Sequence, residues 1–213
     1  ENYRLVGIDA SGLELRMLAH ELNDKGYTNE ILNGDIHTTN QRLAEIESRD
    51  QAKTFIYALL YGAGDAKLGS VVGRGRAVGK GLRQRFFDNL PAFKKLTDRV
   101  QREAKSGFIK ALDGRKLTVR SEHAALNTLL QGAGAIVMKK ALIILDDKIT
   151  KHGWDAKFVA NVHDEWQIEC HVDDAVAVGE AGVHAIREAG CMFNLNCPLD
   201  GAYKVGENWS ETH

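Results

Sequence analysis

Three acidic residues, one near the N-terminus and two that follow it by about 155 positions, have the chemistry to bind a divalent metal ion. Asp9 follows directly on the apolar run 5–8 (LVGI), and Asp164 and Glu165 interrupt two runs of strand-like composition. If adjacent strands bring Asp9 and Asp164 together, the carboxylates repel unless a cation lies between them. Oxygen ligands favour Mg²⁺ or Mn²⁺ over zinc, and two such ions about 3.5–4 Å apart suit in-line displacement at phosphorus. Taken alone, each of these acids would be interpreted as a residue of a solvent-exposed turn.

A row of cations and aromatic residues could serve the same chemistry. Arg49, Lys53 and Tyr57 lie at i, i+4 and i+8. Each step of four turns a helix by roughly 40° past a full circle, so the three line one edge. Tyr61 continues the row, and two cations followed by two aromatics match the order of phosphate, sugar and base. In isolation, this pattern is more typical of a solvated helix face with tyrosines packed inward.

Hydrophobic periodicity predicts the elements that must position these residues. We expect a strand over 3–9, helices over 11–22 and 50–60, loops at Gly26 and Gly34, helices joined by glycine-rich turns over 65–107, a β-hairpin over 108–120, a long helix from Ala124 to Lys151, a hairpin over 158–171 with the acids at its tip, a helix over 173–190 and a short tail. Asp113-Gly114 is the expected turn of the first hairpin.

The charge of the chain is unevenly distributed. The net charge of −1 over 213 residues conceals a basic block over 67–120, with fifteen Lys or Arg against four Asp or Glu. Such a block is typical either of a solvated face or of a lobe that binds a polyanion.

Neither a membrane span nor a signal peptide is expected from the sequence. The cysteines, Cys170, Cys191 and Cys197, are odd in number and lack metal-site spacing. They therefore predict free thiols and a cytoplasmic location, the host cytoplasm if the protein is viral.

Several motifs together resemble family A DNA polymerases (the DNA polymerase I family), most closely the replicative polymerases of podovirus-type phages. The motifs, in order, are the DASGLELR segment from Asp9 to Arg16, the Arg49-x-x-x-Lys53-x-x-x-Tyr57-x-x-x-Tyr61-Gly62 row, and His163-Asp164-Glu165, with NGDIHT (33–38), ALDGRK (111–116) and HAALNTLLQ (123–131) between them. Each motif alone is a modest indication of the family, but the order and spacing of the motifs agree with the family over essentially the whole chain.

The resemblance implies a catalytic site that uses two Mg²⁺ ions, for which Mn²⁺ can substitute. Asp9, Asp164 and the backbone carbonyl of Ala10 would hold the ions, with Glu165 nearby in support. Lys53 would also donate a proton to the leaving pyrophosphate.

The resemblance also assigns contacts to dNTPs and primer-template DNA. His37, Arg49 and Lys53 would hold the phosphates, Tyr57 would pack on the sugar, and Glu14 would block a ribose 2′-OH and hold Tyr61. Tyr61 and Gly62 would stand where the template base arrives, and Asn127, Gln131 and His163 would touch the primer-template near its 3′ end.

The implied fold is α+β, an antiparallel palm sheet with helices and a mostly helical fingers subdomain. The palm would comprise 1–22 and 124–213, and the fingers 23–123. We expect no thumb or exonuclease domain in these 213 residues. A separate chain or a missing segment would then supply those parts, and without a thumb the chain would hold DNA weakly.

Two alternatives stay open beside a DNA polymerase core. A two-metal nuclease would share the carboxylates but has no need of Arg49, Lys53 and Tyr57 on one helix. A catalytically weak or inactive fragment could bind primer-template without turnover. An RNA polymerase is disfavoured by Glu14.

Overall fold

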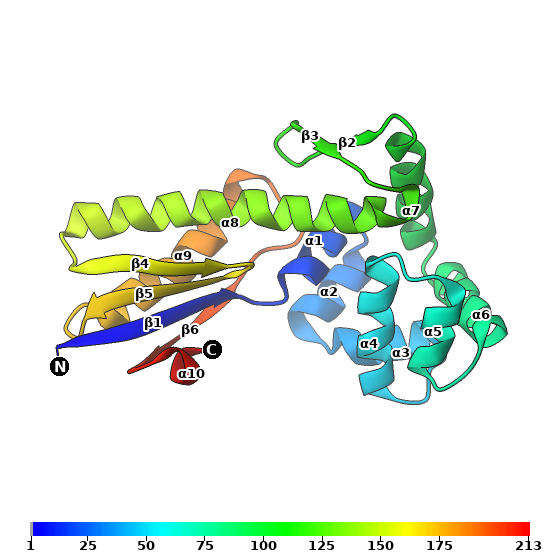
Figure 1. Ribbon diagram of the computed structural model, residues 1–213, viewed down its shortest axis with the longest axis horizontal. Coiled ribbons are helices and arrows are strands. Elements are labelled where there is room, and N and C mark those ends of the chain that lie inside the picture. The colour runs from blue at the N-terminus through cyan, green and yellow to red at the C-terminus, as the bar shows by residue number, and fades with distance from the viewer. Residues whose placement is uncertain (1) are drawn as a thin grey trace. The chain divides into compact units, whose positions relative to one another are not determined.

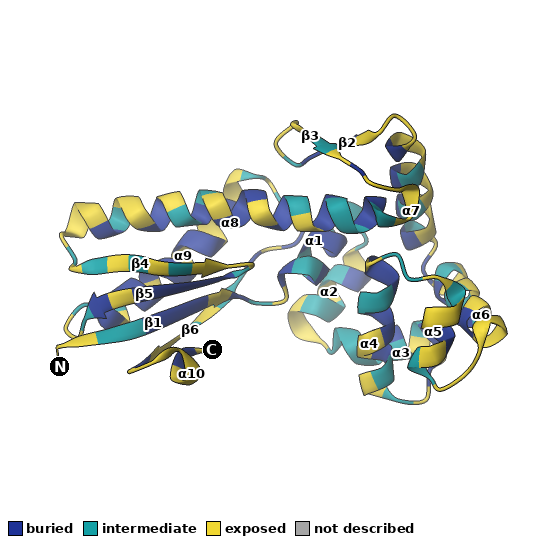
Figure 2. Ribbon diagram, viewed as in Figure 1, coloured by how far each residue is buried: buried dark blue, intermediate teal, exposed yellow. Residues whose placement is uncertain are grey.

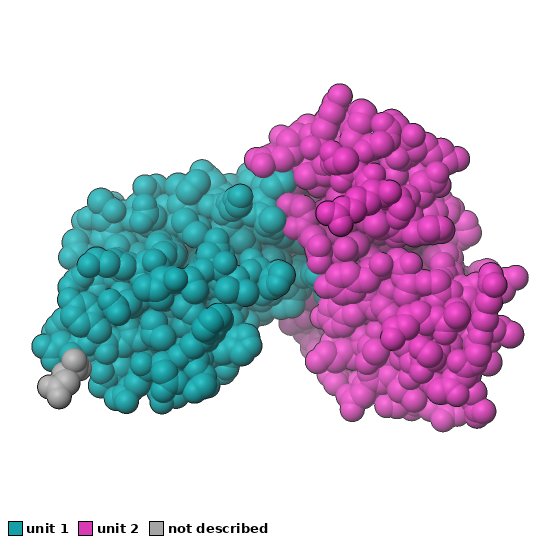
Figure 3. Space-filling view, in the orientation of Figure 1, with its two compact units in different colours: residues 1–17, 133–213 teal, residues 18–132 magenta. Residues whose placement is uncertain are grey.

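The computed structural model describes residues 2–213, which divide into two compact units (Figure 3). Unit 1 contains the chain up to Met17 and from Ala133 to the C-terminus, and unit 2 contains Leu18–Gly132. Two helices, α1 (Leu13–Leu22) and α8 (Ala125–His152), contribute residues to both units. The expected α+β fold is confirmed.

Unit 1 is built on a four-stranded antiparallel sheet in the order β4-β5-β1-β6. Its strands are β1 (Tyr3–Ala10), β4 (Ala156–Val162), β5 (Glu165–His171) and β6 (Gly201–Gly206). The strand over 3–9 and the hairpin over 158–171 are therefore confirmed. Strand β1 lies inside the sheet, with β5 and β6 as its partners (Figure 1).

The two faces of this sheet are covered differently (Figure 1). Ile8 and Trp166 are paired and fully buried on the face that packs against α9 (Ala175–Met192). Gly182 of α9 leaves no room for a Cβ against Ile8, so helix and strand approach closely. The opposite face carries Gly7 and Asp9, because successive residues of a strand point to opposite sides. The short helix α10 (Trp209–Thr212) packs on this second face.

The expected short tail after 190 is wrong for part of its length. Residues 201–212 form β6 and α10. Strand β6 is only six residues long and has glycine at both ends. Its local sequence therefore carries little strand signal, and its structure depends on pairing with β1, which is distant in the sequence.

Two helices follow α1 in the region where the sequence predicted loops at Gly26 and Gly34. They are α2 (Lys25–Asn33) and α3 (Ile36–Ala44). Asp24 caps α2 by accepting a 2.8 Å hydrogen bond from the Tyr27 amide, so the helix continues through Gly26. The loop expected at Gly26 is wrong, since a good N-cap offsets the poor helix propensity of one glycine. Gly34 does end α2.

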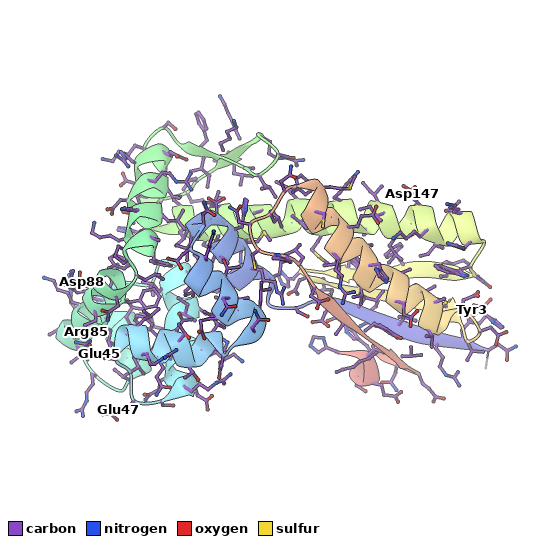
Figure 4. The ribbon with its side chains drawn as sticks, turned by 180° about the vertical axis from the view of Figure 1, so that it is seen from behind. Tyr3, Glu45, Glu47, Arg85, Asp88 and Asp147 are labelled. Carbon is purple, nitrogen blue, oxygen red and sulfur yellow. The ribbon has the colours of Figure 1, made fainter. Side chains whose placement is uncertain are left out.

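The remaining elements of unit 2 agree with the expected helices and hairpin. They are α4 (Arg49–Leu60), α5 (Asp65–Val71), α6 (Arg76–Asn89), α7 (Pro91–Ala104), β2 (Phe108–Lys110), β3 (Lys116–Thr118) and the 3₁₀ helix η1 (Glu122–Ala124). The buried rings of Phe55, Phe86 and Phe93 meet edge to face, with centroids 5.8 and 5.2 Å apart. At the surface, Arg85 forms a 3.3 Å ion pair with Glu45 (Figure 4).

Helix α8, with 28 residues, is the longest helix in the described part of the chain. The segment Glu122–His152 contains an 18-residue window with a mean hydropathy of 1.5, long and apolar enough to cross a membrane by length and composition. Half of that window is buried inside the protein, and buried and exposed residues alternate along α8 (Figure 2). A buried core helix meets the same criterion, so this feature is weak support for a membrane span.

Candidate active site

The acidic residues of unit 1 gather where β1 ends and β5 begins. Asp9 is paired with Glu165 across the two strands, which places both side chains on one face with Cβ atoms about 4.5–5.5 Å apart. His163 and Asp164 form the two-residue turn before Glu165, and His163 has a φ of 54°. The Ala10 amide donates a 2.9 Å hydrogen bond to the Asp164 carbonyl oxygen, which fixes the turn beside the end of β1.

The Asp9 carboxylate carries negative charge that its surroundings do not balance. Burial raises its pKa, and the charges of Asp164 and Glu165 raise it further. Lys204 and His213 act in the opposite direction but leave the pKa above its usual value. A site that disfavours its own charge in this way favours a bound cation.

The few oxygen ligands at this site suit Mg²⁺, which does not need a coordination shell made entirely of protein side chains. Among residues 2–213, no group of three or more His, Cys, Asp or Glu side chains is placed to hold a metal ion. Mg²⁺ commonly binds through one or two carboxylates and completes its shell with water and substrate phosphates. Asp9, Asp164 and the Ala10 carbonyl could supply such a partial shell.

Glu165 differs from Asp9 because hydrogen bonds stabilise its charge. Its Oε1 accepts from the Trp209 indole at 3.0 Å and from the Gln167 amide, while Oε2 lies 2.6 Å from Nδ1 of His213. Burial acts to raise the pKa of Glu165, but the hydrogen bonds from Gln167, His213 and Trp209 outweigh it and the pKa is lowered. Glu165 is thus held ionised beside Asp9.

The partners of Glu165 were not predicted from the sequence. Gln167 follows Glu165 by two positions in a strand, so their shared face was a usable signal. Trp209 and His213 carried no such signal, since their place on the sheet depends on β6 and α10.

The cationic residues of unit 2 lie on the neighbouring helices α3 and α4. Arg49 makes a two-point ion pair with Asp35, with Nε–Oδ2 at 2.6 Å and Nη2–Oδ1 at 3.1 Å. Asp35 is also the N-cap of α3 and accepts from the His37 amide. The Arg49 guanidinium accordingly holds the pKa of Asp35 well below its usual range.

His37 lies close to the two cations of α4, which affect its pKa more strongly than the opposing charge of Asp35 does. Burial lowers the pKa of His37, and the charges of Arg49 and Lys53 lower it further. The ring of Tyr57 lies beside it, with centroids 6.2 Å apart. Four of the residues predicted to hold a nucleotide therefore come together here, in an environment that favours an anion.

The remaining predicted contacts are distributed over several elements. Tyr61 is exposed at the end of α4, and Gly62 follows it with a φ of 76° and lies against the His123 carbonyl. Asn127 and Gln131 lie one turn apart on α8. Glu14 lies in the first turn of α1, and His163 is exposed. The expected hydrogen bond between Glu14 and Tyr61 joins residues of different units and stays a prediction.

Comparison with known proteins identifies the family. The profile of DNA polymerase family A matches residues 1–211. The chain belongs to DNA polymerase family A. The resemblance noted from the motifs of the sequence is thereby confirmed.

Relatives of this family A chain come from phages and bacteria. It is 48% identical to the DNA-directed DNA polymerases of Enterobacteria phage T3 and Escherichia phage T7, in each case over 98% of this chain and 33% of the relative. It is 33% identical to DNA polymerase I of Aquifex aeolicus, over 99% of this chain and 40% of the relative. The chain thus spans about a third of the length of these phage relatives.

A solved structure confirms the fold. The POL domain of Pol1 from M. smegmatis, in complex with DNA primer-template and dNTP, matches 100% of this chain and 41% of its own, with a TM-score of 0.88. At 24% sequence identity, this likeness supports the palm-and-fingers polymerase fold alone.

Proposed function

We propose that this family A chain is the catalytic core of a template-directed DNA polymerase. In the reaction, the primer 3′-OH loses its proton and its oxygen bonds to the α-phosphorus of a dNTP. The bond from that phosphorus to the β-phosphate oxygen breaks, and pyrophosphate leaves. The observation that carries the proposal is the geometry of the acidic residues: Asp9 is paired with Glu165, and a 2.9 Å hydrogen bond from the Ala10 amide holds the Asp164 turn beside them.

In this proposal, the acidic residues of unit 1 hold two divalent cations. Asp9, Asp164 and the Ala10 carbonyl would be the ligands, and Glu165 would support them through its charge. When bound, Mg²⁺ or Mn²⁺ lowers the pKa of the attacking hydroxyl and neutralises charge on the phosphates.

The cationic residues of unit 2 would bind the triphosphate. Phosphoryl transfer depends on positioning and charge neutralisation more than on covalent chemistry from the protein. Arg49, Lys53 and His37 would supply that charge, and incoming phosphate oxygens would compete with Asp35 for the Arg49 guanidinium. Lys53 would protonate the leaving pyrophosphate. A swing of α4 would carry the nucleotide to the metals as a gating step.

The remaining predicted site residues would select the correct nucleotide. Tyr57 would pack on the sugar, and Glu14 would exclude a ribose 2′-OH. Tyr61 and Gly62 would receive the template base. Minor-groove acceptors are common to every correct base pair, so Asn127, Gln131 and His163 could check the shape of the primer end without reading sequence. Because these contacts are made in a complete primer-template complex, primer-template DNA and dNTPs are the proposed partners.

A labelled primer-template separates this proposal from its alternatives. With Mg²⁺ and dNTPs, we expect longer products whose added bases follow the template. Asp9→Asn and Asp164→Asn should reduce extension by about 10³-fold or more, because each removes a charge worth several kcal/mol in the transition state. Shortened primers would support a nuclease instead. A gel shift without any change in primer length would support a binding fragment.

A further inference from the structure

The segment 207–213, here called the C-terminal hook, follows β6, and its helix α10 packs against β6 and β1 (Figure 1). It contributes two of the three groups that contact the Glu165 carboxylate, the Trp209 indole and the His213 imidazole. The third group, the Gln167 amide, lies next to Glu165 on the same face of β5.

The hook is held on the sheet by contacts that require glycine at position 7. A Cβ on Gly7 would lie 2.8 Å from the Cβ of Thr212 and 2.7 Å from Nε2 of Gln167. Thr212 donates a buried 2.8 Å hydrogen bond to Oε1 of Gln167. Since Oε1 accepts from Thr212, the Nε2 group of the same amide faces Glu165 and donates to it.

The hook also has its own internal bonds, which make it a defined structure. The Glu211 carboxylate accepts from the Glu207 amide at 2.8 Å and from the Asn208 side chain at 2.9 Å. Lys204 of β6 donates a 3.0 Å hydrogen bond to the His213 carbonyl. The position of Trp209 is therefore set by the fold of unit 1.

We propose that Trp209 is a positioning residue that acts through Glu165 to set the divalent-cation affinity of the acidic site. Its indole N–H and the Gln167 amide fix one carboxylate oxygen of Glu165, so the negative charge stays in one place opposite Asp9. Loss of a partner that orients a metal ligand typically weakens metal binding by roughly 10- to 100-fold. Because Glu165 supports the ligands instead of binding the ion, we expect the low end of this range. This proposal rests on the metal site of the proposed function.

Mn²⁺ binding to the metal-free 213-residue chain tests this role without any polymerase assay. Trp209→Phe keeps the aromatic packing and removes the N–H, and we expect it to raise the Kd for Mn²⁺ by roughly 10-fold. Trp154→Phe is the matched control, because Trp154 stacks on His152 and precedes the end of β4 that pairs with Cys170, opposite the end that pairs with Glu165. The control should leave the Kd unchanged.

A double-mutant cycle distinguishes positioning from a merely structural role. If Trp209 acts through Glu165, then Trp209→Phe should have little further effect on the Kd for Mn²⁺ in a Glu165→Gln background. If Trp209→Phe does not fold, Gln167→Met removes the other fixed donor and should weaken Mn²⁺ binding similarly. An unchanged Kd in the folded variant, or an equal loss with and without Glu165, would overturn the proposal.

The outcomes for Trp209 and for the proposed function are separable. Weaker Mn²⁺ binding in Trp209→Phe, together with a wild-type chain that extends no primer, would uphold the positioning role and contradict the polymerase proposal. If the wild type extends primers and Trp209→Phe leaves the Mn²⁺ affinity unchanged, the polymerase proposal is upheld and the positioning role of Trp209 is contradicted.

Discussion

At the residue scale, Asp9 and Glu165 are paired carboxylates whose surroundings shift their pKa values in opposite directions. Burial and neighbouring acids raise the pKa of Asp9. Hydrogen bonds outweigh burial and lower the pKa of Glu165. The same side-chain chemistry therefore yields one group that needs a cation and one that is already stabilised as an anion.

This difference predicts that Asp9→Asn stabilises the metal-free chain. A folded-state pKa above the unfolded value means that ionised Asp9 costs stability at neutral pH and that the cost fades as pH falls through the folded pKa. We expect a gain below about 1 kcal/mol, because solvent screens an exposed carboxylate. Thermal unfolding without divalent ions measures it, and the gain should shrink toward acidic pH. Glu165→Gln should instead lose stability at neutral pH. A destabilised Asp9→Asn protein would refute the electrostatic account of this residue.

Under the proposed function, Tyr57 predicts how the chain discriminates between ddNTPs and dNTPs. In family A, Tyr at this position goes with ready use of ddNTPs, and its hydroxyl can replace the hydrogen bond lost with the substrate 3′-OH. Tyr57→Phe should therefore increase discrimination against ddNTPs by roughly 10- to 100-fold, the effect of one hydrogen bond involving a charged partner. Competing ddNTP and dNTP incorporation measures this ratio. Tyr61→Phe serves as the control, and equal discrimination in wild type and Tyr57→Phe would contradict the assignment.

At the element scale, local sequence predicted the structures that local interactions determine. Strand β1, helix α4 and the β4–β5 hairpin carry clear periodicity, so the acidic turn and the cationic edge could be predicted. Strand β6 and helix α10 could not, because their structure depends on distant partners on β1. The Glu165 contacts of Trp209 and His213 were missed for the same reason.

The turn after α4 provides a test of packing within unit 2. Gly62 has a φ of 76°, and a Cβ there would overlap the carbonyl oxygen of His123. Gly62→Ala should destabilise the chain by about 2–4 kcal/mol, from the left-handed backbone and the clash together. Gly64→Ala is the control, since a Cβ there has nothing within 4 Å and the φ is −71°. Denaturant unfolding compares the two, and similar midpoints would rule out this packing argument.

At the scale of the whole molecule, the basic block over 67–120 predicts salt-dependent binding to DNA. Its residues Arg74 and Arg76 are exposed at the start of α6. Replacing either with Gln should weaken affinity uniformly across sequences and reduce the salt slope by about 1 if it contacts a phosphate. Lys94, which pairs with Asp98 at 2.6 Å, offers a control by Lys94→Gln. Binding titrations at several salt concentrations give the slope, and a slope unchanged by both substitutions would remove this surface from the DNA interface.

The most direct test of the account counts two products of one reaction. Primer ends elongated and pyrophosphate released are measured together, with Mg²⁺ and the single dNTP that complements the template. The account predicts one pyrophosphate for each added nucleotide in the wild type, and neither product in Asp9→Asn. Release of nucleoside monophosphates with shortened primers, or undiminished elongation by Asp9→Asn, would contradict it.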